Sequence, residues 1–259
     1  MNNRKPAIFL DVDGCLISDY GNVDADYYQA FFEISERVKK GNIGDGPTVR
    51  LCTARNINSV EIMCAILGIV NSFVITENGI ALYNPATREI KLHPAVTEKM
   101  KGRFERIRRK IIPSILKEWP NLYVYPGNTV YITLVRESGT TPDIETIYEK
   151  IRRKLSGLIG KRAIRIFRSR DTINIGPPRI NKGSGIRFLA DVDNIDLSQS
   201  LGIGDTSQDF PFFRRVGLIG CPANASNECR EFVRSRKGHI SHFSYAQGVA
   251  NIINHFLEK

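Results

Sequence analysis

The stretch FLDVDGCL, residues Phe9–Leu16, places two aspartates one residue apart directly after a short apolar run. Short apolar runs bounded by polar turn residues are typical of buried strands. The sequence therefore predicts a strand that ends at Asp11 and Asp13. Because two acidic residues in a turn are usually just solvated, a functional role for this pair depends on what the rest of the chain brings near it.

The first third of the chain alternates Val/Ile/Leu-rich runs with longer segments that carry apolar residues at helical spacing, and the last third resumes the same alternation. Strands and helices in alternation predict an α/β fold, in which helices cover both faces of a parallel sheet. Residues 85–175 differ, because they read as helix, strand, strand, helix, strand, strand. This αββαββ order predicts a small antiparallel sheet with helices on one face, inserted into a discontinuous core of residues 1–84 and 176–259.

The composition is that of an ordinary globular protein, with 259 residues, of which 42% are hydrophobic and 25% charged. The five cysteines lack C-x-x-C spacing and are predicted to be small buried hydrophobic residues. The longest apolar runs fall short of the ~20 residues that span a bilayer, and the first residues do not resemble a secretory signal. We therefore expect a cytoplasmic protein with no membrane partner, either a monomer or a homodimer.

The formal charge of +10 comes from the middle of the chain, where residues 99–170 hold 18 Lys and Arg against 6 Asp and Glu. A solvated helix face explains most of these basic residues, because they flank an apolar stripe that includes Phe104 and Ile107. A nucleic-acid-binding surface is the alternative from another functional class. It is less favoured because aromatic residues are not interleaved with the basic runs, as base stacking would require.

Polar residues stand at four predicted element ends, namely Asp11-Val12-Asp13-Gly14, Thr53-Ala54-Arg55, Lys182-Gly183, and Gly204-Asp205 with Asp209. The ends of parallel strands meet at one edge of a sheet, so these residues are expected to converge. Carboxylates crowded at one site repel each other unless a cation neutralises them, and oxygen ligands favour Mg²⁺. Taken singly, Thr53, Asp205 and Asp209 could instead be helix caps, and Lys182 a surface charge.

These four segments, DVDGC, CTAR, NKG and GDTSQD, resemble in order and spacing the motifs of the haloacid dehalogenase superfamily, specifically its Cof-like sugar-phosphatase subgroup. The resemblance covers the whole chain and implies a Rossmann-like core with an inserted C2B-type cap. Two motif positions depart from the family pattern, since Cys15 replaces a threonine and Gln208 an asparagine.

The resemblance implies a role for each matching residue. Asp11 would be the nucleophile and Asp13 the general acid and base, while Thr53 and Lys182 would hold the phosphoryl group. The protein ligands of Mg²⁺ would be the Asp11 carboxylate, the Asp13 backbone carbonyl, Asp205 and Asp209. Residues expected to bind the substrate are Gly14, Ala54, Arg55, Asn78, Tyr131 and Arg165.

The last two of these residues belong to the insert, where strand alternation sends Arg165 and Tyr131 to the sheet face opposite the helices. In this subgroup that face overlooks the active site. The expected function is therefore a Mg²⁺-dependent phosphatase that hydrolyses a small phosphorylated metabolite, a sugar phosphate or a phosphoglycolate-like acid, through an aspartyl-phosphate. A phosphosugar mutase of the same superfamily is the alternative, and phosphate release distinguishes the two.

Overall fold

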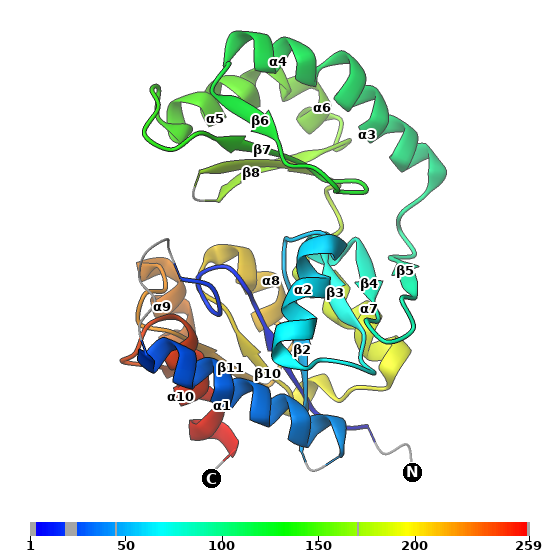
Figure 1. Cartoon of the computed structure of the whole chain (residues 1–259). Helices are drawn as coiled ribbons and strands as arrows, with labels where there is room; N and C mark the ends of the chain where they lie inside the picture. Colours follow the sequence, from blue (N-terminus) through cyan, green and yellow to red (C-terminus); the bar gives the residue numbers. More distant parts are fainter. Residues whose placement is uncertain (1–3, 19–24, 45, 170, 258–259) are drawn as a thin grey trace. The chain divides into compact units, whose positions relative to one another are not determined.

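The computed structural model describes residues 4–18, 25–44, 46–169 and 171–257. The chain forms two compact units, one of residues 1–93 and 181–259 and one of residues 94–180. Each helix within the described ranges is too short or too polar to cross a membrane. The two units are described separately below (Figure 1).

The larger unit is built on a five-stranded sheet in which neighbouring strands are all parallel, with the order β12-β11-β10-β1-β2. Its strands are β1 (Ala7–Leu10), β2 (Thr48–Leu51), β10 (Leu201–Ile203), β11 (Leu218–Cys221) and β12 (His239–Ile240). Strand β1 is an interior strand, because Ile8 pairs with Val49 on one side and with Leu201 on the other.

Helices cover both faces of this sheet, as the alternating pattern predicts. On one face lie α1 (Ala25–Asn42), α2 (Ile57–Leu67) and α10 (Tyr245–Leu257), and on the other lie α7 (Lys182–Asp193), α8 (Phe210–Phe213) and α9 (Asn227–Ser235). Two short 3-10 turns, η2 (Leu197–Gln199) and η3 (Ser207–Asp209), flank β10. Ile8 and Leu10 belong to the first core and Phe9 to the second, which confirms that β1 is buried on both sides.

A second, three-stranded antiparallel sheet extends the larger unit. It consists of β3 (Val74–Thr76), β4 (Ala81–Tyr83) and β5 (Ile90–Leu92), with the turn η1 (Glu77–Gly79) between the first two strands. A parallel bridge between Cys52 and Ile75 links it to the end of β2. Pairing of β5 with β4 keeps residues 85–93 in the larger unit, so the chain leaves this unit after His93 rather than after residue 84.

The smaller unit carries a four-stranded antiparallel sheet with the order β6-β7-β9-β8. Its elements are α3 (Glu98–Lys110), α4 (Ile112–Glu118), β6 (Leu122–Val124), β7 (Ile132–Arg136), α5 (Ile144–Lys154), α6 (Ser156–Gly160), β8 (Arg165–Ser169) and β9 (Thr172–Gly176). Figure 1 shows the four helices on one side of this sheet. The predicted α/β core with an inserted αββαββ antiparallel domain is thereby confirmed.

Proline explains the break between the first two helices of the smaller unit. Helix α3 ends at Lys110, and α4 begins at Ile112 with Pro113 in its first turn, where the missing N–H has no helical acceptor to lose. The apolar stripe predicted across this region is buried at Phe104, Ile107 and Ile115.

Candidate active site

Three carboxyl ends of parallel strands carry the predicted polar residues of the larger unit. Asp11 follows β1 directly, Thr53 comes two residues after β2, and Asp205 comes two residues after β10. Because β1 lies between β2 and β10, the side chains that follow these strands lie at the same edge of the sheet. Lys182 reaches this edge from the first residue of α7.

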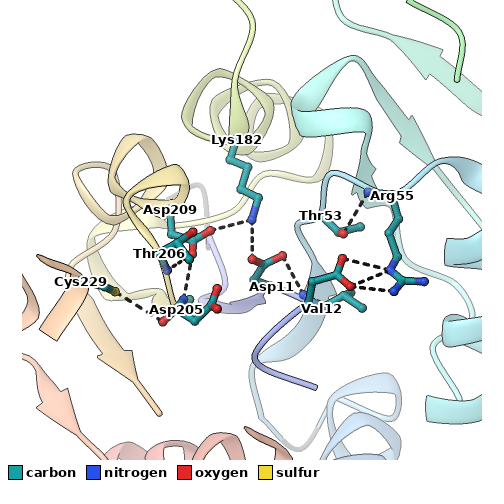
Figure 2. A network of polar contacts seen from close by, with 11 residues as sticks. Asp11, Val12, Thr53, Arg55, Lys182, Asp205, Thr206, Asp209 and Cys229 are labelled. Carbon is teal, nitrogen blue, oxygen red and sulfur yellow. Dashed lines mark hydrogen bonds and ion pairs between the residues drawn. The ribbon is translucent and has the colours of Figure 1, made fainter. Parts of the chain in front are cut away.

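Lys182 joins two of the carboxylates (Figure 2). Its Nζ lies 2.7 Å from Oδ2 of Asp11 and 2.6 Å from Oδ1 of Asp209. All three side chains are buried, with at most 5% of each residue exposed. The nearby carboxylates outweigh the effect of burial and raise the pKa of Lys182, so the ammonium group stays protonated.

The start of α7 explains how an ammonium group is held at this depth. Asn181 caps the helix, because its Oδ1 accepts a hydrogen bond from the backbone N–H of Ser184 at 3.1 Å. Gly183 follows Lys182, and a Cβ atom at this position would lie 2.1 Å from the carbonyl oxygen of Pro211. Glycine therefore permits α7 to approach α8 closely enough for Lys182 to reach Asp209.

Asp209 is held by the turn that follows β10. Its Oδ2 accepts hydrogen bonds from the backbone N–H groups of Asp205, at 2.9 Å, and of Thr206, at 3.1 Å. Asp209 thus forms a capping box with Thr206 and also contacts Lys182, so the capping role and the site role coexist.

The carboxylates of Asp11, Asp205 and Asp209 form one buried cluster, in which one oxygen from each residue lies within 4.8 Å of the others. Burial raises the pKa of Asp11, and the charges of Asp209 and Asp205 raise it further, while Lys182 opposes the shift. Lys182 contacts two of these three carboxylates, and its one positive charge does not neutralise three negative charges when all three are ionised. Such a set of hard oxygen donors suits a divalent cation such as Mg²⁺.

Asp13 points to a different partner. The Arg55 guanidinium donates hydrogen bonds to its carboxylate, from Nε at 3.0 Å and from Nη2 at 2.7 Å. Among the four predicted metal-binding residues, Asp13 thus has a carboxylate that pairs with Arg55. This pairing is compatible with the sequence-based prediction, which assigned only the Asp13 backbone carbonyl to the metal. Arg55, predicted to bind the substrate, holds this second aspartate.

Backbone hydrogen bonds fix the segment that carries Thr53 and Arg55. The Thr53 N–H donates to Ile75 at 3.1 Å, and its carbonyl accepts from Asn78 at 2.9 Å. The Thr53 Oγ1 accepts from the Arg55 N–H at 3.1 Å. Two residues predicted to bind the substrate differ in exposure, since Asn78 is buried and Ala54 is exposed. Through its hydrogen bond, Asn78 supports the Thr53 backbone.

The loop after β1 has a partner that the sequence-based interpretation missed. The Nδ2 of Asn224 donates to the carbonyl oxygen of Gly14 at 2.9 Å, and its Oδ1 accepts from the Tyr245 N–H at 2.7 Å. Asn224 follows β11, so the rule that located the other strand ends could have found it. Cys15, which departs from the family pattern, is fully buried beside this loop, and Gln208, the other departure, is half-buried in η3.

The remaining predicted residues, Tyr131 and Arg165, lie in the smaller unit. They contact each other, because Nη2 of Arg165 donates to the Tyr131 hydroxyl. Tyr131 is only 1% exposed, so its ring is not available as a surface for a ligand, whereas Arg165 is half-buried.

Three similarities to known proteins accompany this geometry. A phosphoglycolate phosphatase of Methanobrevibacter smithii is 20% identical, over 96% of this chain and all of that protein. The solved sucrose-phosphatase of Synechocystis sp. PCC6803 is 20% identical and covers 98% of both chains with a TM-score of 0.67. A solved HAD/COF-like hydrolase of Plasmodium vivax is 15% identical, with a TM-score of 0.71 over 98% of this chain and 96% of that one.

The likeness to the two solved structures concerns the fold. A family model adds direct evidence from the sequence, because the model for haloacid dehalogenase-like hydrolases matches residues 120–253, which include Lys182, Asp205 and Asp209. This match spans more than half of the chain and includes the third and fourth of the four motifs. The protein therefore belongs to the haloacid dehalogenase-like hydrolases.

Proposed function

We propose that the protein is a Mg²⁺-dependent phosphatase that hydrolyses a small phosphorylated metabolite through an aspartyl-phosphate on Asp11. The observation that carries the proposal is the contact of Lys182 with Asp11 at 2.7 Å inside a cluster of three buried carboxylates. Family membership and phosphatase-named relatives, among them phosphoglycolate phosphatases, support the same reaction class.

Asp11 is oriented for attack on phosphorus. Its Oδ1 accepts a hydrogen bond from the Val12 N–H at 2.7 Å, and its Oδ2 contacts Lys182. These two donors fix the carboxylate and favour its ionised form against the effect of burial. In the first step an Asp11 oxygen bonds to phosphorus, and the bond from phosphorus to the ester oxygen breaks.

Asp13 serves the leaving group in that step and the water in the next one. It gives a proton to the departing ester oxygen, and then takes a proton from the water that attacks the phosphorus of the aspartyl-phosphate. The products are the free alcohol, inorganic phosphate and the regenerated Asp11 carboxylate. The Arg55 guanidinium holds Asp13 in place, and the Thr53 hydroxyl and Lys182 contact the transferring phosphoryl group.

The Asp11, Asp205 and Asp209 carboxylates, together with the Asp13 carbonyl, would hold Mg²⁺. When bound, this ion supplies positive charge beside the phosphoryl oxygens as negative charge develops on them. The same charge offsets the repulsion among the carboxylates that raises the pKa of Asp11.

A screen of phosphorylated metabolites for phosphate release, run with Mg²⁺ and with a chelator, tests the proposal. The screen includes phosphate esters of uncharged sugars and phosphorylated hydroxy acids. Asp11→Asn should abolish release, while Asp191→Asn, an exposed change on α7, should leave it intact. Intact-protein mass spectrometry of Asp13→Asn should detect a phosphoryl adduct that Asp11→Asn lacks. Undiminished release by Asp11→Asn would remove Asp11 as the nucleophile.

A further inference from the structure

Helix α2 of the larger unit is apolar on its solvent side as well as on its core side (Figure 1). Its sequence, INSVEIMCAIL, holds a single charged residue, Glu61. The inner side buries Val60 and Leu67, whereas Ile62 and Ile66 on the outer side are 62% and 59% exposed. A surface helix normally carries polar residues on its outer side, and a helix that is apolar on both sides is normally covered on both.

The neighbouring helix α1 extends this apolar surface. The Ser35 hydroxyl donates to the carbonyl oxygen of the last residue of α2 at 3.2 Å, and Nδ2 of Asn42 donates to the carbonyl oxygen of Gly68 at 2.9 Å. Phe32 lies one helical turn before Ser35, and Ile43 follows Asn42 directly. Both side chains are exposed, so the contacts between the two helices bring further apolar surface to the border of α2.

Strand β5 extends the same surface from the direction of β4. The Tyr83 hydroxyl on β4 donates to Oε1 of Glu61 at 2.9 Å, which places Tyr83 beside α2. Ile90 on β5 lies opposite Tyr83 in the antiparallel register, so the two side chains share one face of the sheet. Ile90 is 51% exposed and therefore adds to the apolar area next to α2.

The exposed apolar area is large for a single protein surface. The six contributing side chains, here called the α2 surface, are 46% to 74% exposed, and they are Phe32, Ile43, Ile62, Ile66, Val70 and Ile90. With about 150–200 Å² for each side chain when fully exposed, they offer on the order of 600 Å². This estimate reaches the upper end of the largest patch on a typical monomer, about 300–600 Å². A stable interface takes roughly 800 Å² per partner including its polar rim, so the α2 surface is of the right size for one.

We propose that the α2 surface binds a second copy of this chain, about a twofold axis that passes close to Ala65. Ala65 is exposed between Ile62 and Ile66, and its small side chain allows two copies of α2 to approach closely. Each chain carries a formal net charge of +10, yet this uncharged stripe can meet its own copy without placing like charges opposite each other.

The apolar character of the α2 surface favours a second copy over a transient partner of another kind. Interfaces of homodimers are more apolar than those of complexes that form and separate, which resemble the rest of a protein surface. The inference concerns assembly through the larger unit, so it stands or falls independently of the proposed phosphatase function.

Sedimentation equilibrium of the full chain from about 1 to 100 µM tests the proposal, because dimerisation depends on concentration by mass action. The mass should rise to that of two chains. Ile62→Asp places a charge in the apolar interface and should raise the dissociation constant at least about a hundredfold. Ile66→Gln adds a polar group without a charge and should raise it by about threefold to thirtyfold. Both positions are exposed in one chain, so circular dichroism should show that both variants are folded.

Phe243→Asp is the matched control, because it adds the same charge at an exposed apolar residue in the loop before α10, outside the α2 surface. It should leave the dissociation constant unchanged. The mass of one chain at every concentration would overturn the proposal. A folded Ile62→Asp variant that dimerises as tightly as the wild-type protein would overturn it as well.

A covalent crosslink tests the place of the twofold axis. All five native cysteines are buried, so Ala65→Cys adds one exposed thiol. Diamide oxidises two thiols to a disulfide by taking up their two hydrogens, and a non-reducing gel then separates crosslinked from single chains. Ala65→Cys should crosslink at least about tenfold faster than Glu33→Cys, because a disulfide requires Cα atoms within about 7 Å. Glu33 is exposed on the side of α1 that borders α10. Equal rates for the two variants would overturn the position of the interface.

Discussion

Arg55 donates hydrogen bonds to both carboxylate oxygens of Asp13, with Nε 3.2 Å from Oδ1 and 3.0 Å from Oδ2, and Nη2 2.7 Å from Oδ1. The pair joins the loop after β1 to the loop after β2. It fixes the direction of a side chain that is 42% exposed and would otherwise rotate freely. Arg55 therefore acts as a positioning residue for the proposed acid and base.

Replacing Arg55 with alanine tests this role. We expect kcat to fall by about threefold to thirtyfold, because Asp13 loses its orientation but keeps its proton-transfer group. The free energy of unfolding should change by less than about 1 kcal/mol, since the ion pair is solvent-accessible. Steady-state kinetics and urea denaturation measure both quantities, with the exposed Arg234→Ala on α9 as control. An unchanged kcat would contradict the assignment.

Removal of Lys182 should destabilise the larger unit. Lys182→Met leaves Asp11 and Asp209 buried without their cation, and breaking such a buried pair typically costs about 3–5 kcal/mol. Mg²⁺ should restore part of the loss because it supplies charge to the same carboxylates. Urea denaturation with and without Mg²⁺ measures this, and Lys40→Met on the exposed side of α1 is the control. A loss under about 1 kcal/mol would show that the pair is not needed for folding.

Stability should depend on pH in opposite ways with and without Mg²⁺. The pKa of Asp11 is raised in the folded protein, so without metal its contribution to stability is present below the ordinary value of 3.8 and is lost as pH rises through the folded value. Mg²⁺ replaces the proton and should raise Tm by an amount that grows with pH. Thermal melts with Mg²⁺ and with a chelator across a pH series measure this. In Asp11→Asn the growth with pH should shrink.

The cysteine thiols should resist modification in the folded protein. All five are buried and free, which confirms the interpretation of these residues as small hydrophobic side chains. Burial raises the pKa of Cys64 to about 12, so its reactive thiolate is scarce at neutral pH. A colorimetric thiol reagent should therefore react only after unfolding in denaturant. Rapid labelling of the native protein would indicate that a buried segment opens readily.

Gly176→Ala should disturb the smaller unit, because the added methyl group would occupy the position of the Tyr131 ring. We expect a loss of about 1–3 kcal/mol in the free energy of unfolding, as for other overpacked sites. Gly157→Ala is the matched control, since Gly157 lies in α6 with open space around it, and the change should be neutral or stabilising. Equal effects of the two changes on the free energy of unfolding would show that the Tyr131 ring can move to another position.

The sequence was sufficient to predict the general fold, because hydrophobic periodicity indicates which segments form strands and which form helices. Buried strands such as β1 and amphipathic helices such as α3 have patterns that depend only on neighbouring residues. The pairing of β4 with β5 was not predicted, because each of these strands has three residues and three residues show no periodicity. Because β5 pairs with β4, the first junction between the two units lies after His93 and not after residue 84.

The candidate site was predictable where a general rule applies and not elsewhere. Asp11, Asp205 and Lys182 come together because they end strands or open a helix at one sheet edge. The pairing of Arg55 with Asp13 depends on the path of a loop, and the burial of Tyr131 depends on the missing side chain across the sheet at Gly176. Such contacts are set by three-dimensional packing, which a local pattern does not record.

The position of β1 between β2 and β10 has a consequence for synthesis. Ile8 pairs with Leu201, so one side of β1 has no partner strand until residue 201 has been made. The residues of the smaller unit, 94–180, emerge from the ribosome completely before that partner does. The inserted unit can therefore be folded while the first strand still has an open edge. That edge is where a growing chain would be most prone to aggregate.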